Sequence, residues 1–229
     1  KPSLVQQLGV LVILLVTSYW LLVIGRYWLA DAQFSKAEKL SKSGQYNLAF
    51  KAANQAVGLR PFEPGYHDEL GLDLAGLASL AKNENNATLS AQLAKMAVGQ
   101  SDFALKISPF NLNFWKNRVK IFYRLGELDN QYYQQALSAL LQAEQLAPTD
   151  PKIKYNLGLL YAQFGQTQAA IKTLEETVAL KPNYPDVRYA LALFYEQAGR
   201  KDEARQQLEY ILLSIDPQNQ KIKEMLEKM

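Results

Sequence analysis

The stretch that decides the fold is Lys154–Pro182, KYNLGLLYAQFGQTQAAIKTLEETVALKP. Apolar and small residues recur in it at helical spacing on two successive helices, at Leu157, Gly158 and Tyr161 and then at Ala170 and Leu174. Gly165 is placed to end the first helix, and Pro182 closes the second. A glycine at position 158 lets the partner helix approach closely. The stretch therefore predicts a helical hairpin, which cannot bury both faces alone and needs neighbours of its own kind.

Prolines close further units of this kind along the chain. They are separated by 48, 39, 34 and 35 residues and are Pro61, Pro109, Pro148, Pro182 and Pro217. The spacing resembles the tetratricopeptide repeat (TPR), and the resemblance implies a right-handed solenoid of helical hairpins. We expect an all-α chain with a long N-terminal hydrophobic helix, about five hairpins and a C-terminal capping helix. The expected boundaries are 1–29 for the hydrophobic helix, 30–63, 64–111, 112–150, 151–184 and 185–217 for the repeats, and 218–229 for the cap.

The second repeat exceeds the 34-residue period by 14 residues. Its excess falls around the polar run Lys82–Thr88, which predicts an exposed loop between lengthened helices. The same run contains Asn86-Ala87-Thr88, an acceptor pattern for N-glycosylation. Asn86 is therefore a candidate modification site.

The N-terminal segment Leu8–Ile24 has no charged residue, and the apolar character covers residues 4–24. Its length is near the lower limit for a membrane span. A signal peptide is the weaker interpretation, because no small-residue cleavage site follows the run. Two interpretations remain open: the helix anchors the chain in a membrane, or the helices of many copies bundle into the core of a filament. Basic residues after the run, taken alone, place the repeats in the cytoplasm.

The composition argues against catalysis. There is no cysteine and one histidine, which excludes thiol catalysis, disulfides and the usual structural zinc sites. The net charge of +3 is spread over interspersed residues of both signs, so no basic field indicates nucleic acid. His67 occupies a repeat position often held by tryptophan, and we expect it to be packed and hydrogen-bonded rather than a general base. We therefore expect no enzyme activity, no cofactor and no metal.

The TPR resemblance implies a binding groove lined by the first helix of each repeat. Carried onto this sequence, the groove residues are Lys116, Lys120, Tyr123, Lys152, Tyr155, Leu159, Tyr189, Leu193 and Glu196. Tyrosines beside a leucine and lysines suit a protein partner, held as an extended peptide or a helix, or another copy of the chain. The alternative is that some of these rings only pack against the adjoining repeat.

The overall layout is similar to the membrane-anchored C-terminal TPR tails of O-antigen ligase or polymerase-like proteins. The likeness extends to sequence segments such as NFWKNRVKIFY and YNLGLLYAQFGQ. This likeness implies an accessory, extracytoplasmic module at a membrane or cell surface, and no catalytic motif of that family is present in these residues. Three functions stay open: a non-enzymatic scaffold for protein–protein interaction, a self-assembling subunit of an extracellular filament, and an accessory module of a glycan-polymerising or ligating membrane enzyme.

Overall fold

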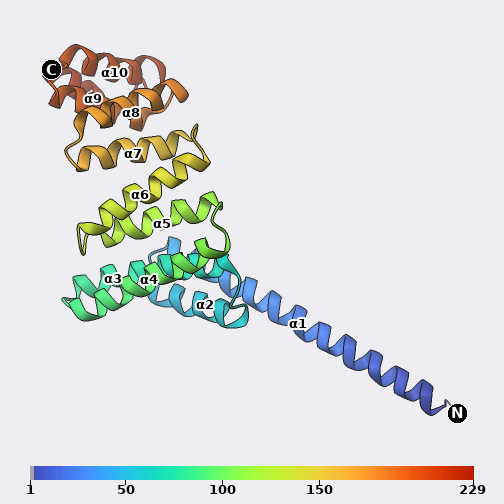
Figure 1. Cartoon of the computed structure of the whole chain (residues 1–229). Coiled ribbons are helices and arrows are strands. Elements are labelled where there is room, and N and C mark those ends of the chain that lie inside the picture. Colours follow the sequence, from blue (N-terminus) through green and yellow to red (C-terminus); the bar gives the residue numbers. More distant parts are fainter. Residues whose placement is uncertain (1–2) are drawn as a thin grey trace. The chain divides into compact units, whose positions relative to one another are not determined.

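The computed structural model describes residues 3–229, which are helical throughout apart from turns (Figure 1). The all-α prediction is therefore confirmed for the described residues. The chain forms two compact units, one ending at Tyr132 and the other beginning at Tyr133.

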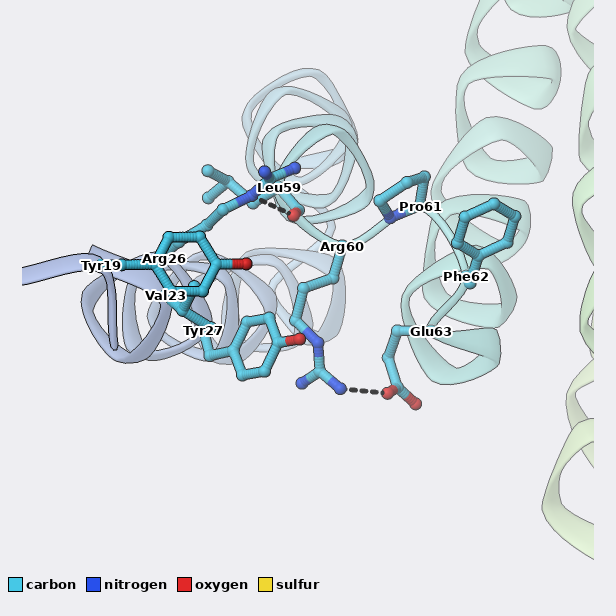
Figure 2. Close-up of a pocket in the computed structure, with 9 residues that line it drawn as sticks. All are labelled: Tyr19, Val23, Arg26, Tyr27, Leu59, Arg60, Pro61, Phe62 and Glu63. Atoms are coloured by element: carbon cyan, nitrogen blue, oxygen red, sulfur yellow. Dashed lines mark hydrogen bonds and ion pairs between the residues drawn. The ribbon is translucent and has the colours of Figure 1, made fainter. Parts of the chain in front are cut away.

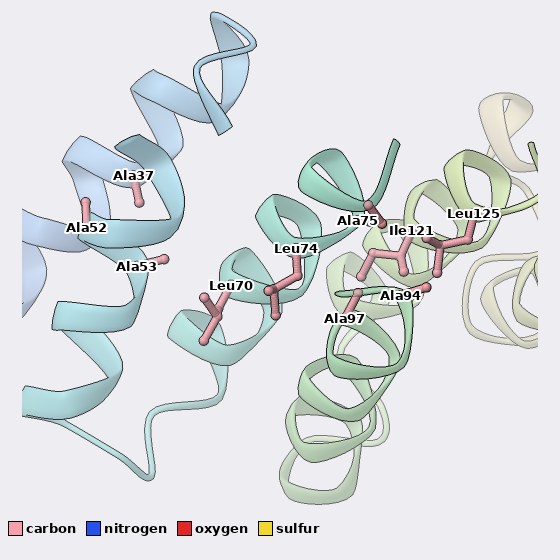
Figure 3. Packing of buried hydrophobic residues seen from close by; sticks show 11 residues of the cluster. Ala37, Ala52, Ala53, Leu70, Leu74, Ala75, Ala94, Ala97, Ile121 and Leu125 are labelled. Carbon is pink, nitrogen blue, oxygen red and sulfur yellow. The ribbon is translucent and has the colours of Figure 1, made fainter. Parts of the chain in front are cut away.

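Unit 1 is built from five helices. They are α1 (Leu4–Lys42), α2 (Tyr46–Leu59), α3 (Pro64–Asn83), α4 (Ala87–Ile107) and α5 (Leu112–Leu125). α1 packs with α2 and α3 with α4, and α3 also contacts α1, α2 and α5. In the core, alanines of α1 and α2 face Leu70 and Leu74 of α3, and Ile121 and Leu125 of α5 complete the cluster (Figure 3). The small residues on the first hairpin let α3 lie close to it.

α1 is one unbroken helix of 39 residues. No proline falls between Tyr27 and Ser43, so the sequence allows the hydrophobic helix to pass directly into the first helix of the repeats, and the backbone is continuous through residue 29. Side chains from Ser3 to Leu22 are exposed, whereas Ala30 and Ala37 are fully buried within unit 1. The N-terminal part of α1 extends away from the other helices of the unit (Figure 1). The same helix is therefore both the apolar segment and half of the first hairpin.

Most of the extra residues of the long second repeat lie in its two helices. α3 has 20 residues and α4 has 21, and only Glu84–Asn86 connect them. Asn85 adopts a left-handed conformation with φ 59°. The side chain of Asn86 caps α4 by accepting from the Leu89 amide at 3.1 Å. Asn86 is exposed, and its glycosylation stays a prediction.

Unit 2 contains the remaining helices. They are α6 (Gln131–Leu146), whose first two residues precede the boundary, α7 (Pro151–Gln163), α8 (Thr167–Leu180), α9 (Pro185–Gln197), α10 (Lys201–Ser214) and α11 (Gln220–Lys228). α7 pairs with α8 and α9 with α10. Gly165 and Gly199 end the first helices with positive φ of 72° and 76°, which an L side chain adopts only with strain. α11 places Ile222 on the core of this unit.

Three hairpins begin with the same hydrogen bond. A side chain in the first helix donates to the carbonyl of the proline six residues earlier: His67 to Pro61 at 2.9 Å, Trp115 to Pro109 at 2.7 Å and Arg188 to Pro182 at 2.7 Å. His67 is 8% exposed, and its ring lies 4.0 Å from that of Phe103. The prediction that His67 is a packed, hydrogen-bonded residue is confirmed.

Replacing Gly158 by leucine should destabilise the fold. A Cβ on this buried glycine would lie 2.8 Å from the Cγ and Cδ2 atoms of Leu174, which is fully buried. We expect the free energy of unfolding to fall by roughly 1–3 kcal/mol through overpacking. Gly99→Leu is the matched control, because Gly99 is an exposed helical glycine with no atom within 4 Å of its added Cβ. Chemical denaturation of both variants measures the effect, and equal stability would contradict the packing described.

Candidate functional site

Three carboxylates gather on α3 where it lies between α1 and α5. Asp68, Glu69 and Asp73 are 5%, 8% and 0% exposed. We call these three residues the acidic seam. Charged side chains are rarely buried to this extent unless they are paired. The seam is thus the most unusual polar feature of unit 1.

The seam carboxylates are only partly satisfied. The Asn117 side chain of α5 donates to Oδ2 of Asp68 at 2.6 Å. Within residues 3–229, Oδ1 of Asp68 has no hydrogen-bond partner, and the carboxylate oxygens of Asp73 have none of good geometry, although the Ser41 hydroxyl is near enough to lower the pKa of Asp73. Buried acceptors without donors carry a desolvation penalty of about 1–3 kcal/mol each. A donor supplied by another molecule would relieve it.

Burial shifts the protonation of all three groups. It raises the pKa of Asp68 to about 7, a rise that the Asn117 hydrogen bond and the charge of Lys120 oppose and Glu69 reinforces. Burial likewise raises the pKa of Asp73 to about 7, against the opposing effects of Ser41 and Arg124. The pKa of Glu69 is raised by burial first and by Glu38 second. Near neutral pH the seam therefore holds protons that exposed carboxyls would have lost.

Two cations near the seam are held by other groups. Nζ of Lys120 donates to Oδ1 of Asn117 at 2.9 Å. Nη1 of Arg124 donates to the Leu72 carbonyl at 3.4 Å, and its guanidinium lies 4.9 Å from the centre of the Tyr46 ring. These contacts explain why the neighbouring charges do not restore ordinary pKa values to Asp68 and Asp73.

Our sequence interpretation missed the seam, although a signal was present. Aligned on the repeats, Asp73 takes the position held by Ile121, Leu160 and Phe194 in the later hairpins. Ile121 and Leu160 are buried core residues. A carboxylate at a position that is apolar in every one of these sister repeats indicates either a stability defect or a binding role.

The predicted groove residues lie on first helices of both units. In unit 1, Lys116, Lys120 and Tyr123 are on α5, and Lys120 lies beside the seam. In unit 2 the six candidates are Lys152, Tyr155 and Leu159 on α7 and Tyr189, Leu193 and Glu196 on α9.

Two of the candidate tyrosines in unit 2 contact their own chain. The ring of Tyr155 is 5.6 Å from that of Tyr184, and Nζ of Lys221 is 4.4 Å from the centre of the Tyr189 ring. Both rings also pack against the core of the unit. The two rings therefore pack within their own unit, as the alternative interpretation expects. Their part in partner binding stays a prediction.

A hollow of about 480 Å³ lies where the exposed part of α1 meets the turn after α2 (Figure 2). Nε of Arg26 donates to the Leu59 carbonyl at 2.6 Å. The Arg60 guanidinium lies 4.6 Å from the centre of the Tyr27 ring and pairs with Glu63 at 2.8 Å. The exposed ring of Phe62 stands at the rim. Within residues 3–229, neither this hollow nor any other place gathers three or more residues able to hold a metal ion.

Known proteins share this architecture. The family model described as tetratricopeptide repeat matches residues 127–183 and 161–227. The chain has a TPR fold. A comparison with curated proteins found no match. The expected likeness to O-antigen ligase tails has no support among the matches.

Solved TPR structures align with most of the chain. A thermophilic TPR protein of Thermus thermophilus has 23% identity and a TM-score of 0.56, with 87% of this chain and 97% of that one covered. PilF of Pseudomonas aeruginosa has 23% identity and a TM-score of 0.60, covering 81% and 76%. YrrB, described as a TPR protein with an unusual peptide-binding site, has 17% identity and a TM-score of 0.58, covering 86% and 91%. At these identities the likeness shows the TPR fold alone.

The buried carboxyls should make the chain less stable as pH rises. Asp73 has a folded pKa of about 7 against an ordinary value of 3.8, so the folded state keeps a proton that the unfolded state releases between these values. The contribution of Asp73 to the free energy of unfolding is therefore fully present at low pH and is lost as the pH rises to 7. Asp73→Asn should raise the free energy of unfolding at pH 8 by roughly 2–4 kcal/mol and change it little near pH 4.

Urea denaturation at a series of pH values measures this difference. Glu84→Gln is the control, because Glu84 is an exposed carboxylate at the end of α3. A pH dependence that is the same in the parent chain and in Asp73→Asn would show that Asp73 titrates normally.

Proposed function

We propose that the chain is a non-enzymatic scaffold, anchored in a membrane by α1, which binds a protein partner through the acidic seam of unit 1. The observation that carries the binding role is the placement of three carboxylates, Asp68, Glu69 and Asp73, on one helix at no more than 8% exposure, where a partner cation reaches them once neighbouring side chains move aside. The partner group that fits them is a lysine or arginine side chain, which brings both charge and donors. The TPR fold supports an interaction role in general terms.

The anchoring role is supported by α1. Within the described residues it is the one helix long and apolar enough to cross a membrane. None of the side chains in its most apolar window is buried. Large apolar surfaces of this kind are covered in the native state by lipid or by protein. A signal sequence has the same composition, but here the helix continues into the fold through buried Ala30 and Ala37.

Placing two arginines in the middle of the apolar segment should release the chain from membranes. Leu14→Arg and Leu15→Arg together cost about 5–7 kcal/mol in a bilayer span. We expect the parent chain to stay in the pellet after alkaline carbonate extraction and the double variant to leave it. Leu48→Arg is the control, because Leu48 is an exposed leucine on α2. Soluble fibres formed by the parent without detergent would contradict anchoring and favour the filament alternative.

The acidic seam should select basic peptides. A cation that pairs with Asp68 or Asp73 favours the ionised carboxylate and lowers its pKa, so binding releases protons below pH 7. We expect a phage-displayed library of random dodecapeptides, panned on the detergent-solubilised chain, to be enriched in lysine and arginine. The affinity of an enriched peptide should rise as the pH increases from 6 to 8.

Titration calorimetry of that peptide in two buffers of different ionisation enthalpy measures the proton release. Asp68→Asn with Asp73→Asn should remove the release and weaken binding by on the order of tenfold, the equivalent of 1.4 kcal/mol. Glu84→Gln should change neither quantity. Enriched peptides without basic residues, or unchanged binding by the double variant, would contradict the seam assignment.

A further inference from the structure

Unit 1 exposes two phenylalanines at equivalent places. Phe62 and Phe110 are 80% and 83% exposed. Each follows the proline that closes a hairpin, and the same position in the later hairpins holds Thr149, Asn183 and Gln218. An exposed ring in one turn is common, but the repetition in unit 1 and its absence from the other closing turns indicate a local requirement.

The turn that carries Phe62 is held against α1 immediately beyond its apolar run. Arg26 of α1 donates to the Leu59 carbonyl at 2.6 Å, and the guanidinium of Arg60 covers the Tyr27 ring (Figure 2). Arg26 lies two residues after Ile24, a rise of about 3 Å along the helix axis. When Leu8–Ile24 crosses a bilayer, the turn 60–63 therefore lies at the level of the headgroups.

The turn that carries Phe110 lies on the same edge of unit 1. His67, in the first turns of α3, donates to the Pro61 carbonyl, and its ring stacks on Phe103 near the end of α4. The start of α3 and the end of α4 are thus side by side, and the turns 60–63 and 108–111 adjoin them. Trp115 fixes the second turn by donating to the Pro109 carbonyl at 2.7 Å. We call these two turns the phenylalanine edge.

We propose that the phenylalanine edge rests on the membrane, with the rings of Phe62 and Phe110 inserted at the boundary between headgroups and acyl chains. The proposal rests on the anchoring proposed above. Its occupant is lipid because the edge continues the apolar surface of α1 at the same level. Aromatic rings on a surface next to a span are stabilised in this zone. The charges of the edge do not oppose contact, since Arg60 is paired with Glu63 at 2.8 Å.

The consequence is a fixed orientation of unit 1. A single helix allows its attached unit to tilt and rotate, whereas two further contacts at separate turns oppose both motions. The opposite ends of the hairpins, at the turns 43–45 and 84–86, then point away from the membrane.

The absence of cysteine from the chain makes a site-specific test direct. Single variants Phe62→Cys, Phe110→Cys, Glu84→Cys and Leu14→Cys are labelled with a nitroxide and reconstituted into phosphatidylcholine vesicles. Each edge label leaves the other phenylalanine in place. Electron paramagnetic resonance then compares collisions with oxygen, which concentrates in lipid, and with a water-soluble nickel chelate.

We expect the oxygen-to-nickel collision ratio at positions 62 and 110 to be several-fold higher than at 84, and the ratio at 14 to be the highest. A lipid-exposed label at 14 with aqueous labels at 62 and 110 would overturn the edge contact and leave anchoring intact. Labels at 62 and 110 shielded from both reagents would indicate a second copy of the chain instead of lipid, and so overturn the proposal. An aqueous label at 14 would overturn anchoring and the edge contact together.

Discussion

The continuity of α1 is the constraint on which unit 1 depends. One helix of 39 residues must suit two environments, because its first half is exposed and apolar and its second half contributes Ala30 and Ala37 to the core. A helix transmits rotation and tilt along its axis, since its backbone hydrogen bonds are unbroken. Phe34 of α1 packs on Tyr66 of α3 with ring centres 5.1 Å apart, so the second hairpin is coupled to the same axis. Whatever orients the apolar segment therefore orients the acidic seam.

The acidic seam is the place where the sequence departs from the rules that stabilise the rest of the fold. Burying a carboxylate is unfavourable unless hydrogen bonds or charges compensate, and Asp73 has no hydrogen bond of good geometry to either oxygen within residues 3–229. This penalty raises the pKa of Asp68 and Asp73 to about 7, so that each carboxyl is protonated below neutral pH and ionised, at a cost in stability, above it. A carboxyl with a pKa near 7 loses its proton when a cationic ligand binds near neutral pH. An exposed carboxyl is already ionised there, so its protonation does not change. The seam carboxylates thus lower the stability of the free chain, and a bound molecule that supplies donors and positive charge would recover it.

The sequence predicted the features that local rules control. Gly165 ends a helix because the left-handed conformation there favours glycine, and His67 is packed and hydrogen-bonded, as expected at a repeat position often held by tryptophan. It did not predict Asp73, since a charge on a helix is ordinarily solvated and only the alignment with Ile121 and Leu160 places it in the core. The boundary expected at residue 29 marks a change in composition within one helix, because no proline interrupts the chain between Tyr27 and Ser43.

The hydrogen bond that opens the hairpins shows how the repeats diverge in sequence while they keep one backbone. In three hairpins a side chain reaches the carbonyl of the preceding proline, and imidazole, indole and guanidinium all do so in His67, Trp115 and Arg188. In the fourth hairpin Lys154 occupies this position and instead bridges Glu144 and Glu176 at 2.9 and 3.0 Å. The hydrogen bond therefore recurs with different side chains, and a hairpin also forms without it. Unit 1 likewise keeps its paired helices, α1 with α2 and α3 with α4, although the family match begins only at residue 127.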